Sequence, residues 1–199
     1  MNINLSADDI AMRKWTPMLR DELRIVDERC NYLATTLFTE ICSIPEATLD
    51  GMSDVLSYAD RFNEVACFIN CLAQRQAEGN INNLEHRAHL VLSNYMCFVY
   101  LGDACFLRMR KLVPNTSVAR RCFEYLTDNP VRAFRNAIAH ANWKVSDATV
   151  EFWARKGEEK NEPLSPFIVR DLERQFWFYL TLCVGKSTFA ALSQRSPQQ

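Results

Sequence analysis

The stretch MLRDELRIVDERCNYLATTLFTEICS, residues 18–43, decides the fold class of this chain. Its apolar residues recur at intervals of three and four, which is the period of one face of an α-helix. Thr16 and Pro17, an N-cap residue and a proline for the first helical position, precede it, and Pro45 follows it. The apolar positions are Leu19, Leu23, Val26, Cys30, Leu33, Leu37, Phe38 and Ile41. The pattern predicts one long helix that buries one face in a core.

The helical period continues along most of the chain. Further helices are predicted over residues 8–15, 56–78, 83–113, 115–126 and 130–141. Asn115 and Thr116 are the expected cap of the fourth of these, and Asn129 with Pro130 the expected start of the fifth. A closing apolar helix is expected to begin at Asp171, or at an earlier residue near 167, and to end near residue 193.

The pattern changes between the last two helices. Residues 149–155 are β-branched and aromatic, residues 156–162 form a polar turn, and residues 163–169 supply a second strand. In an alternative interpretation, Ser165 and Pro166 cap the closing helix directly. The predicted fold class is therefore all-α: an antiparallel bundle of five or more helices with one small β-hairpin after residue 143.

The composition indicates one globular domain over residues 1–199, with a core over about 17–193. Hydrophobic residues make up 48% of the 199 residues and charged residues 24%, which excludes a disordered chain. With only five glycines and seven prolines, the sequence disfavours a turn-rich all-β fold and a glycine-rich nucleotide loop.

The sequence predicts a cytoplasmic protein that does not associate with membranes. Residues 1–9 carry acids where a signal peptide has basic residues, and no long apolar segment follows them. The most apolar stretches, residues 95–101 and 176–184, are much shorter than the ~18–20 residues that a membrane-spanning helix needs.

The eight cysteines lie within apolar helical pattern, so we expect reduced thiols rather than disulfides. Cys67 and Cys71 are four residues apart, and His86 and His89 are three apart, which together offer four ligands for a zinc-stabilised regulator. The sequence has no CxxC knuckle, and cysteine also packs as a small apolar residue. We therefore predict neither a metal nor a cofactor, and elemental analysis for zinc tests the alternative.

Positive charge is concentrated in residues 108–144, although the whole chain carries a formal net charge of −1. This segment has two acids, Glu124 and Asp128. Its basic residues are Arg108, Arg110, Lys111, Arg120, Arg121, Arg132, Arg135 and Lys144. Such a segment is typical of a local phosphate-binding surface, because arginine and lysine neutralise phosphates. The alternative is an ordinary solvated helix face.

The most informative part of this segment is FRNAIAHANW, residues 134–143. At 100° per residue, Val131, Phe134, Ile138 and Ala141 share one helix face, which predicts a buried face. The opposite face carries Arg132, Asn136 and His140. Arg135 lies about 140° around the helix from His140, so these two side chains do not easily meet on one isolated helix. A second copy whose helix crosses near a two-fold axis would complete the pair in a shared cleft.

Histidine and arginine together suit cleavage of an RNA phosphodiester. Histidine has an unperturbed pKa of about 6.5 and exchanges protons near neutral pH. Arginine binds a phosphate bidentately and stabilises charge that develops on phosphorus. In the alternative interpretation, Arg135 forms a surface ion pair and His140 caps the last carbonyls of its helix.

The six residues Arg135 to His140 resemble the R-polar-x-x-x-H motif of the HEPN superfamily, all-helical domains that include many metal-independent ribonucleases. The resemblance implies a dimer with Arg135 and His140 as the catalytic pair and Asn136 as a helper. Glycine often follows the motif histidine, where this chain has Ala141. Members controlled by a nucleotidyltransferase-like partner carry a tyrosine shortly afterwards, where Asn142 and Trp143 stand here, so the sequence does not support that mode of control.

The sequence thus predicts a metal-independent endoribonuclease that acts as a homodimer on RNA. The resemblance implies a bacterial toxin or an effector of antiviral defence or stress, with an antitoxin or another regulatory partner. Arg132, Arg121, Arg120 and Lys144 are the predicted RNA-binding residues. The alternative is a non-catalytic HEPN-like module that dimerises or binds a nucleotide, RNA or protein through the same surface.

Overall fold

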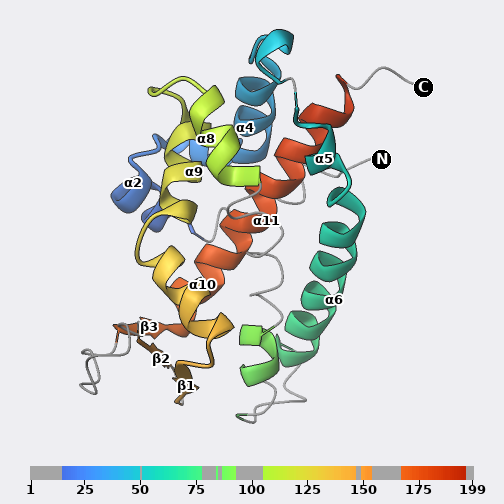
Figure 1. Ribbon diagram of the computed structural model, residues 1–199. Coiled ribbons are helices and arrows are strands. Elements are labelled where there is room, and N and C mark those ends of the chain that lie inside the picture. Colours follow the sequence, from blue (N-terminus) through green and yellow to red (C-terminus); the bar gives the residue numbers. More distant parts are fainter. Residues whose placement is uncertain are drawn as a thin grey trace, which may run out of the picture.

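A computed structural model describes residues 15–49, 51–77, 84, 87–92, 105–146, 149–153 and 167–195, and these residues are mostly helical. Helix α11, Asp171–Ser193, runs through the middle of the molecule, with the other helices around it (Figure 1). It packs against α4, Leu33–Cys42, and α9, Val118–Thr127. The closing helix is confirmed, and its N-cap is Arg170.

The prediction of one long helix over residues 18–43 is wrong, because the structure has three shorter helices in this stretch. These are α2, Thr16–Leu23, α3, Asp27–Asn31, and α4. Arg24 ends α2 in the left-handed region, with φ at 53°, and its carbonyl accepts a hydrogen bond of 2.8 Å from the Arg121 guanidinium. The predicted apolar positions are nonetheless buried, apart from Val26, which is 58% exposed, and the half-buried Phe38.

The next described elements are the 3-10 turn η1, Glu46–Thr48, α5, Ser53–Leu56, and α6, Ala59–Ala77. The predicted helix over 83–113 is described only in part: residues 87–92 are helical, and α8 spans Leu107–Leu112 and ends before Pro114. The helix expected over residues 8–15 lies outside the described residues, apart from Trp15, which is in a turn.

Two predicted helix starts are wrong. Helix α9 is capped by Ser117 rather than by Asn115 and Thr116, because the Ser117 hydroxyl accepts a 3.0 Å hydrogen bond from the Arg120 amide. Helix α10 spans Val131–Ala139, and Pro130, not Asn129, occupies its N-cap position.

The predicted β-hairpin is a three-stranded antiparallel sheet in the order β1-β2-β3, so the hairpin prediction is also wrong. The strands are β1, Trp143–Val145, β2, Thr149–Phe152, and β3, Phe167–Arg170. The register pairs Trp143 with Phe152, and Phe152 with Phe167. Because residues 167–170 form a strand, the closing helix does not begin before Asp171.

Aromatic packing fixes α10 against the sheet and α11. The Phe134 ring lies 5.3 Å from that of Phe152 and 5.5 Å from that of Trp177, both edge to face. All three side chains belong to the buried core. None of the helices in the described ranges combines the length and apolar character needed to cross a bilayer.

Candidate functional site

The candidate site lies on α10, whose two faces have the predicted burial. Val131, Phe134, Ala137 and Ile138 are buried, whereas Arg132, Asn136 and His140 are exposed. Ala141 was predicted on the buried face but is exposed, because α10 ends at residue 139 and the chain turns away. The polar face of α10 is therefore open to solvent along its length.

The C-terminal end of α10 closes with a Schellman motif. The Asn142 amide donates to the Ala137 carbonyl at 2.8 Å, and the Ala141 amide donates to the Ile138 carbonyl at 3.2 Å. Ala141 has a φ of 55°, in the left-handed region that this motif requires and that glycine adopts most easily. His140 is the C-cap, immediately before this reversal.

The sheet also binds the backbone that follows the end of α10. The Asn142 carbonyl accepts a 3.1 Å hydrogen bond from the Trp153 amide, which extends the pairing of β1 with β2 by one residue. The backbone at Asn142 is thus bonded to α10 through its amide and to the sheet through its carbonyl. His140 stands on a well-fixed backbone while its side chain is exposed.

Arg135 and Asn136 are in contact near the same end of α10. The half-buried Arg135 places Nη2 3.4 Å from Oδ1 of Asn136, a long hydrogen bond. The backbone carbonyl of Asn136 accepts a 3.2 Å hydrogen bond from the His140 amide. Asn136 therefore stands between the other two motif residues, while the Arg135 and His140 side chains leave the axis about 140° apart.

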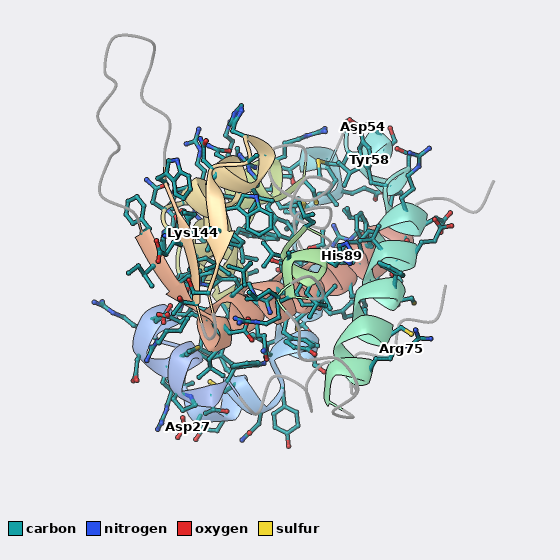
Figure 2. The ribbon with its side chains drawn as sticks, turned by 90° about the horizontal axis from the view of Figure 1, so that it is seen from below. Asp27, Asp54, Tyr58, Arg75, His89 and Lys144 are labelled. Carbon is teal, nitrogen blue, oxygen red and sulfur yellow. The ribbon has the colours of Figure 1, made fainter. Side chains whose placement is uncertain are left out.

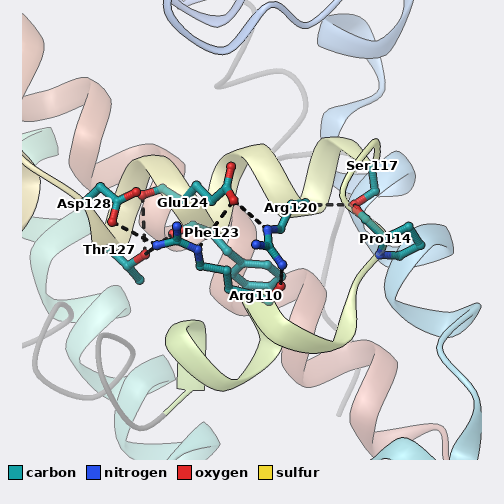
Figure 3. Close-up of polar contacts among 8 residues, drawn as sticks. All are labelled: Arg110, Pro114, Ser117, Arg120, Phe123, Glu124, Thr127 and Asp128. Carbon is teal, nitrogen blue, oxygen red and sulfur yellow. Dashed lines mark hydrogen bonds and ion pairs between the residues drawn. The ribbon is translucent and has the colours of Figure 1, made fainter.

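Several basic side chains of residues 108–144 form ion pairs and hydrogen bonds within the chain. Figure 3 shows Glu124 between two arginines: Oε1 lies 2.6 Å from Arg120 Nε and 3.6 Å from Arg110 Nε. Arg110 also pairs with Asp128 at 2.9 Å, and Arg120 donates to the Arg110 carbonyl. This network ties α8 to α9. Elsewhere, Arg108 forms an ion pair of 3.0 Å with Asp54 of α5.

Of the predicted RNA-binding residues, three already have partners in the chain. Arg120 pairs with Glu124, Arg121 donates to the Arg24 carbonyl, and Lys144 lies 2.9 Å from Glu151 on the next strand. Figure 2 shows Lys144 on the sheet. Arg132 is exposed, and the described part of the chain offers it no ion-pair partner. It lies on the same face as Asn136 and His140.

The described residues do not support the zinc site that the sequence offers as an alternative. Cys67 and Cys71 are exposed on α6, His89 is exposed within residues 87–92, and His86 lies outside the described residues. Among the side chains that the structure describes, no three metal-binding groups come together. The described cysteines are free thiols, and burial raises the pKa of the Cys105 thiol to about 12.

Sequence reasoning missed a polar cluster where α11 begins. Arg174, whose side chain is only 5% exposed, lies 2.8 Å from Asp171, and the Gln175 amide donates to the same carboxylate at 2.8 Å. Burial raises the pKa of Asp171, but the charge and hydrogen bonds of Arg174 and Gln175 outweigh it and leave the pKa lowered. Asp171 and Arg174 are three apart on a helix, and that spacing was the available signal.

Comparisons of the chain with protein-family models, with curated proteins and with solved structures find no match. The resemblance to HEPN proteins stays a prediction from the sequence motif Arg135 to His140. Function is therefore inferred from the chemistry of α10 itself.

Proposed function

We propose that this chain is a cytoplasmic, metal-independent endoribonuclease of HEPN type that acts as a homodimer on RNA. The observation that carries the proposal is the solvent-exposed face of α10, where Arg132, Asn136 and His140 stand beside Arg135 on a backbone held by both helix and sheet. A preorganised group loses little on reaching the transition state, which is what general acid–base catalysis needs.

The proposed reaction is a transesterification. His140 accepts the proton of a ribose 2′-hydroxyl while that oxygen attacks the adjacent phosphorus and the bond from phosphorus to the 5′-oxygen breaks. A second histidine returns a proton to the departing 5′-oxygen. The products are a 2′,3′-cyclic phosphate and a 5′-hydroxyl, and Arg135 stabilises the charge on the phosphoryl oxygens.

The dimer is part of the proposal because one α10 presents Arg135 and His140 about 140° apart. Two α10 helices that cross near a two-fold axis place the arginine of one copy beside the histidine of the other. The same arrangement supplies the two histidines that the reaction uses as base and acid.

RNA contacts are assigned first to Arg132, which is exposed on the catalytic face. Arg121, whose partner is a neutral carbonyl, adds positive potential from α9. Arg120 and Lys144 bind phosphate in this proposal by exchanging their partners Glu124 and Glu151 for it. By resemblance, the biological role is that of a bacterial toxin or an effector of antiviral defence or stress, controlled by an antitoxin or another partner.

A non-catalytic HEPN-like module is the second candidate function. The observation that favours it is the internal pairing of Arg110, Arg120, Arg121 and Lys144, which leaves less free positive charge for a phosphate backbone than the sequence suggests. Such a module uses the α10 face to dimerise or to bind a nucleotide, RNA or protein.

One experiment separates the two candidates. Purified protein is incubated with total RNA in EDTA, and the ends of the fragments are sequenced. Discrete cuts that end in 2′,3′-cyclic phosphate, absent with His140→Ala, support the endoribonuclease. His89→Ala, which removes another exposed histidine, is the matched control and retains cleavage. No cleavage at any protein concentration favours the binding module.

A further inference from the structure

Helix α6 presents an exposed stripe formed by Glu64, Cys67, Phe68, Cys71 and Arg75. Their spacing of three, one, three and four residues places them along one side of the helix. Phe68, near the middle, is 58% exposed, and both thiols are exposed. Figure 2 shows Arg75 at the outer edge of the molecule. An exposed aromatic ring between two thiols is an apolar centre that none of the described residues covers.

Opposite charges stand at the two ends of this stripe. Glu64 and Arg75 are eleven residues apart, or about 16 Å along the helix, so they do not pair with each other. Neither has an ion-pair partner among the residues that the structure describes. The stripe is thus negative at its N-terminal end, apolar in the middle and positive at its C-terminal end.

That order of charges is self-complementary. When two copies of one helix pack antiparallel about a two-fold axis, the residue numbers of facing positions have a constant sum. The register that places Glu64 opposite Arg75 of the second copy also places Phe68 opposite its Cys71. A single register therefore forms two equivalent ion pairs and two equivalent aromatic–thiol contacts.

We propose that the Glu64–Arg75 stripe of α6 binds the same stripe of a second copy of this chain, antiparallel across a two-fold axis. Cysteine packs as a small apolar residue and its sulfur contacts aromatic rings favourably, so the centre suits Phe68 of the other copy. The ion pairs at the ends select the antiparallel orientation, because a parallel pair places like charges together.

This interface is independent of the proposed function. Figure 1 shows α6 and α10 as separate elements of the molecule, so pairing through α6 adds to pairing at α10 and does not replace it. If both faces pair, each copy contacts two others and the assembly is larger than a dimer, and if α6 alone pairs, it is a dimer. A contact between two helices is small for a specific interface, so association depends on concentration.

Charge reversal tests the proposal. Glu64→Arg places two arginines at each end of the interface, and Arg75→Glu places two glutamates there. Each single variant is expected to lower the mass of the wild-type assembly, to that of a monomer if α6 alone pairs, as measured by sedimentation over about two orders of magnitude in concentration. The double variant E64R/R75E restores the pairs with reversed sign and is expected to restore the mass. Glu28→Arg, which makes the same change on the exposed surface of α3, leaves the mass unchanged.

The thiols give a second readout. As wild-type protein is concentrated, Cys67 and Cys71 are expected to react more slowly with a maleimide, whereas in Glu64→Arg their rates do not depend on concentration. Circular dichroism and melting checks that each variant is folded. A wild type that is monomeric throughout, a single variant that assembles like wild type, or a folded double variant that does not recover overturns the proposal. None of these outcomes depends on whether RNA is cleaved.

Discussion

Ala141 carries a Cβ in a left-handed backbone conformation that favours glycine. Its φ of 55° closes the Schellman motif at the end of α10, yet a Cβ in the left-handed region costs about 1 kcal/mol. The conformation persists because the Asn142 amide and carbonyl are bonded to Ala137 and Trp153. The strain lies directly after His140 and is held there by helix and sheet together.

Ala141→Gly is therefore expected to stabilise the protein by about 0.4–1 kcal/mol, because glycine adopts this backbone without strain. The free energy of unfolding in urea measures the effect. Ala139→Gly, in the last helical residue two positions earlier, is the control and is expected to destabilise by about 0.5–1 kcal/mol. Equal losses in both variants contradict the role given to the left-handed turn.

His140→Ala is expected to slow RNA cleavage by roughly 10²–10⁴-fold with little effect on folding, because the side chain is exposed and acts in proton transfer. Arg135→Ala is expected to have a comparable effect. If His140 only caps the helix, its loss lowers stability by about 0.3–1 kcal/mol and leaves activity near normal. Cleavage rate and melting temperature, measured on the same preparations, distinguish these outcomes.

The sequence predicts those features of the site that depend on the α10 helix alone. Arg132, Asn136 and His140 lie on one exposed face because helical period alone places them there. Ala141 was misplaced because the period was extended past the residue where α10 ends. The contact of Arg121 with Arg24 joins residues 97 apart in sequence, and no local pattern contains it.

Among the elements, helix boundaries differ most from the prediction. The break between α2 and α3 lies inside an unbroken apolar period, and Arg24 has no sequence signal for a left-handed residue. The contact from Arg121 of α9 stabilises that bend. Strand β1 was missed because a three-residue strand such as Trp143–Val145 depends on its pairing with β2. The apolar pattern predicts helix α11 but leaves its start open between residue 167 and Asp171, where the structure begins it.

Ser117→Ala is expected to destabilise the protein by about 1 kcal/mol, because the Ser117 hydroxyl accepts the Arg120 amide at the start of α9. Urea unfolding at neutral pH measures the loss. Ser57→Ala is the control: its exposed hydroxyl donates to the Asp54 carbonyl but caps no helix start, and the expected change is within about 0.5 kcal/mol. A larger loss from Ser57→Ala than from Ser117→Ala contradicts the assignment of the cap.

At the scale of the whole molecule, α11 connects the parts that position the site. Its Trp177 packs on Phe134 of α10, and its first turn continues directly from β3. Asp171 binds Arg174 and Gln175 in that first turn, so the cluster fixes the place where the sheet joins the central helix. Loss of this cluster is expected to affect global stability rather than a single loop.

Asp171→Asn is expected to lower the free energy of unfolding by about 1–3 kcal/mol at neutral pH, because it removes the carboxylate charge that lies 2.8 Å from the buried Arg174 guanidinium. The pKa of Asp171 is lowered in the folded protein, so its contribution is complete above the unfolded value of about 3.9 and disappears as the pH falls through the folded value. The difference in free energy of unfolding between wild type and variant should therefore be large at neutral pH and small in acid.

Asp27→Asn is the control for this prediction. It removes the exposed 3.5 Å pair with Arg20 and is expected to change the free energy of unfolding little at either pH. A loss from Asp171→Asn that is the same at both pH values shows that the amide disturbs packing, and that charge at Asp171 does not stabilise the fold.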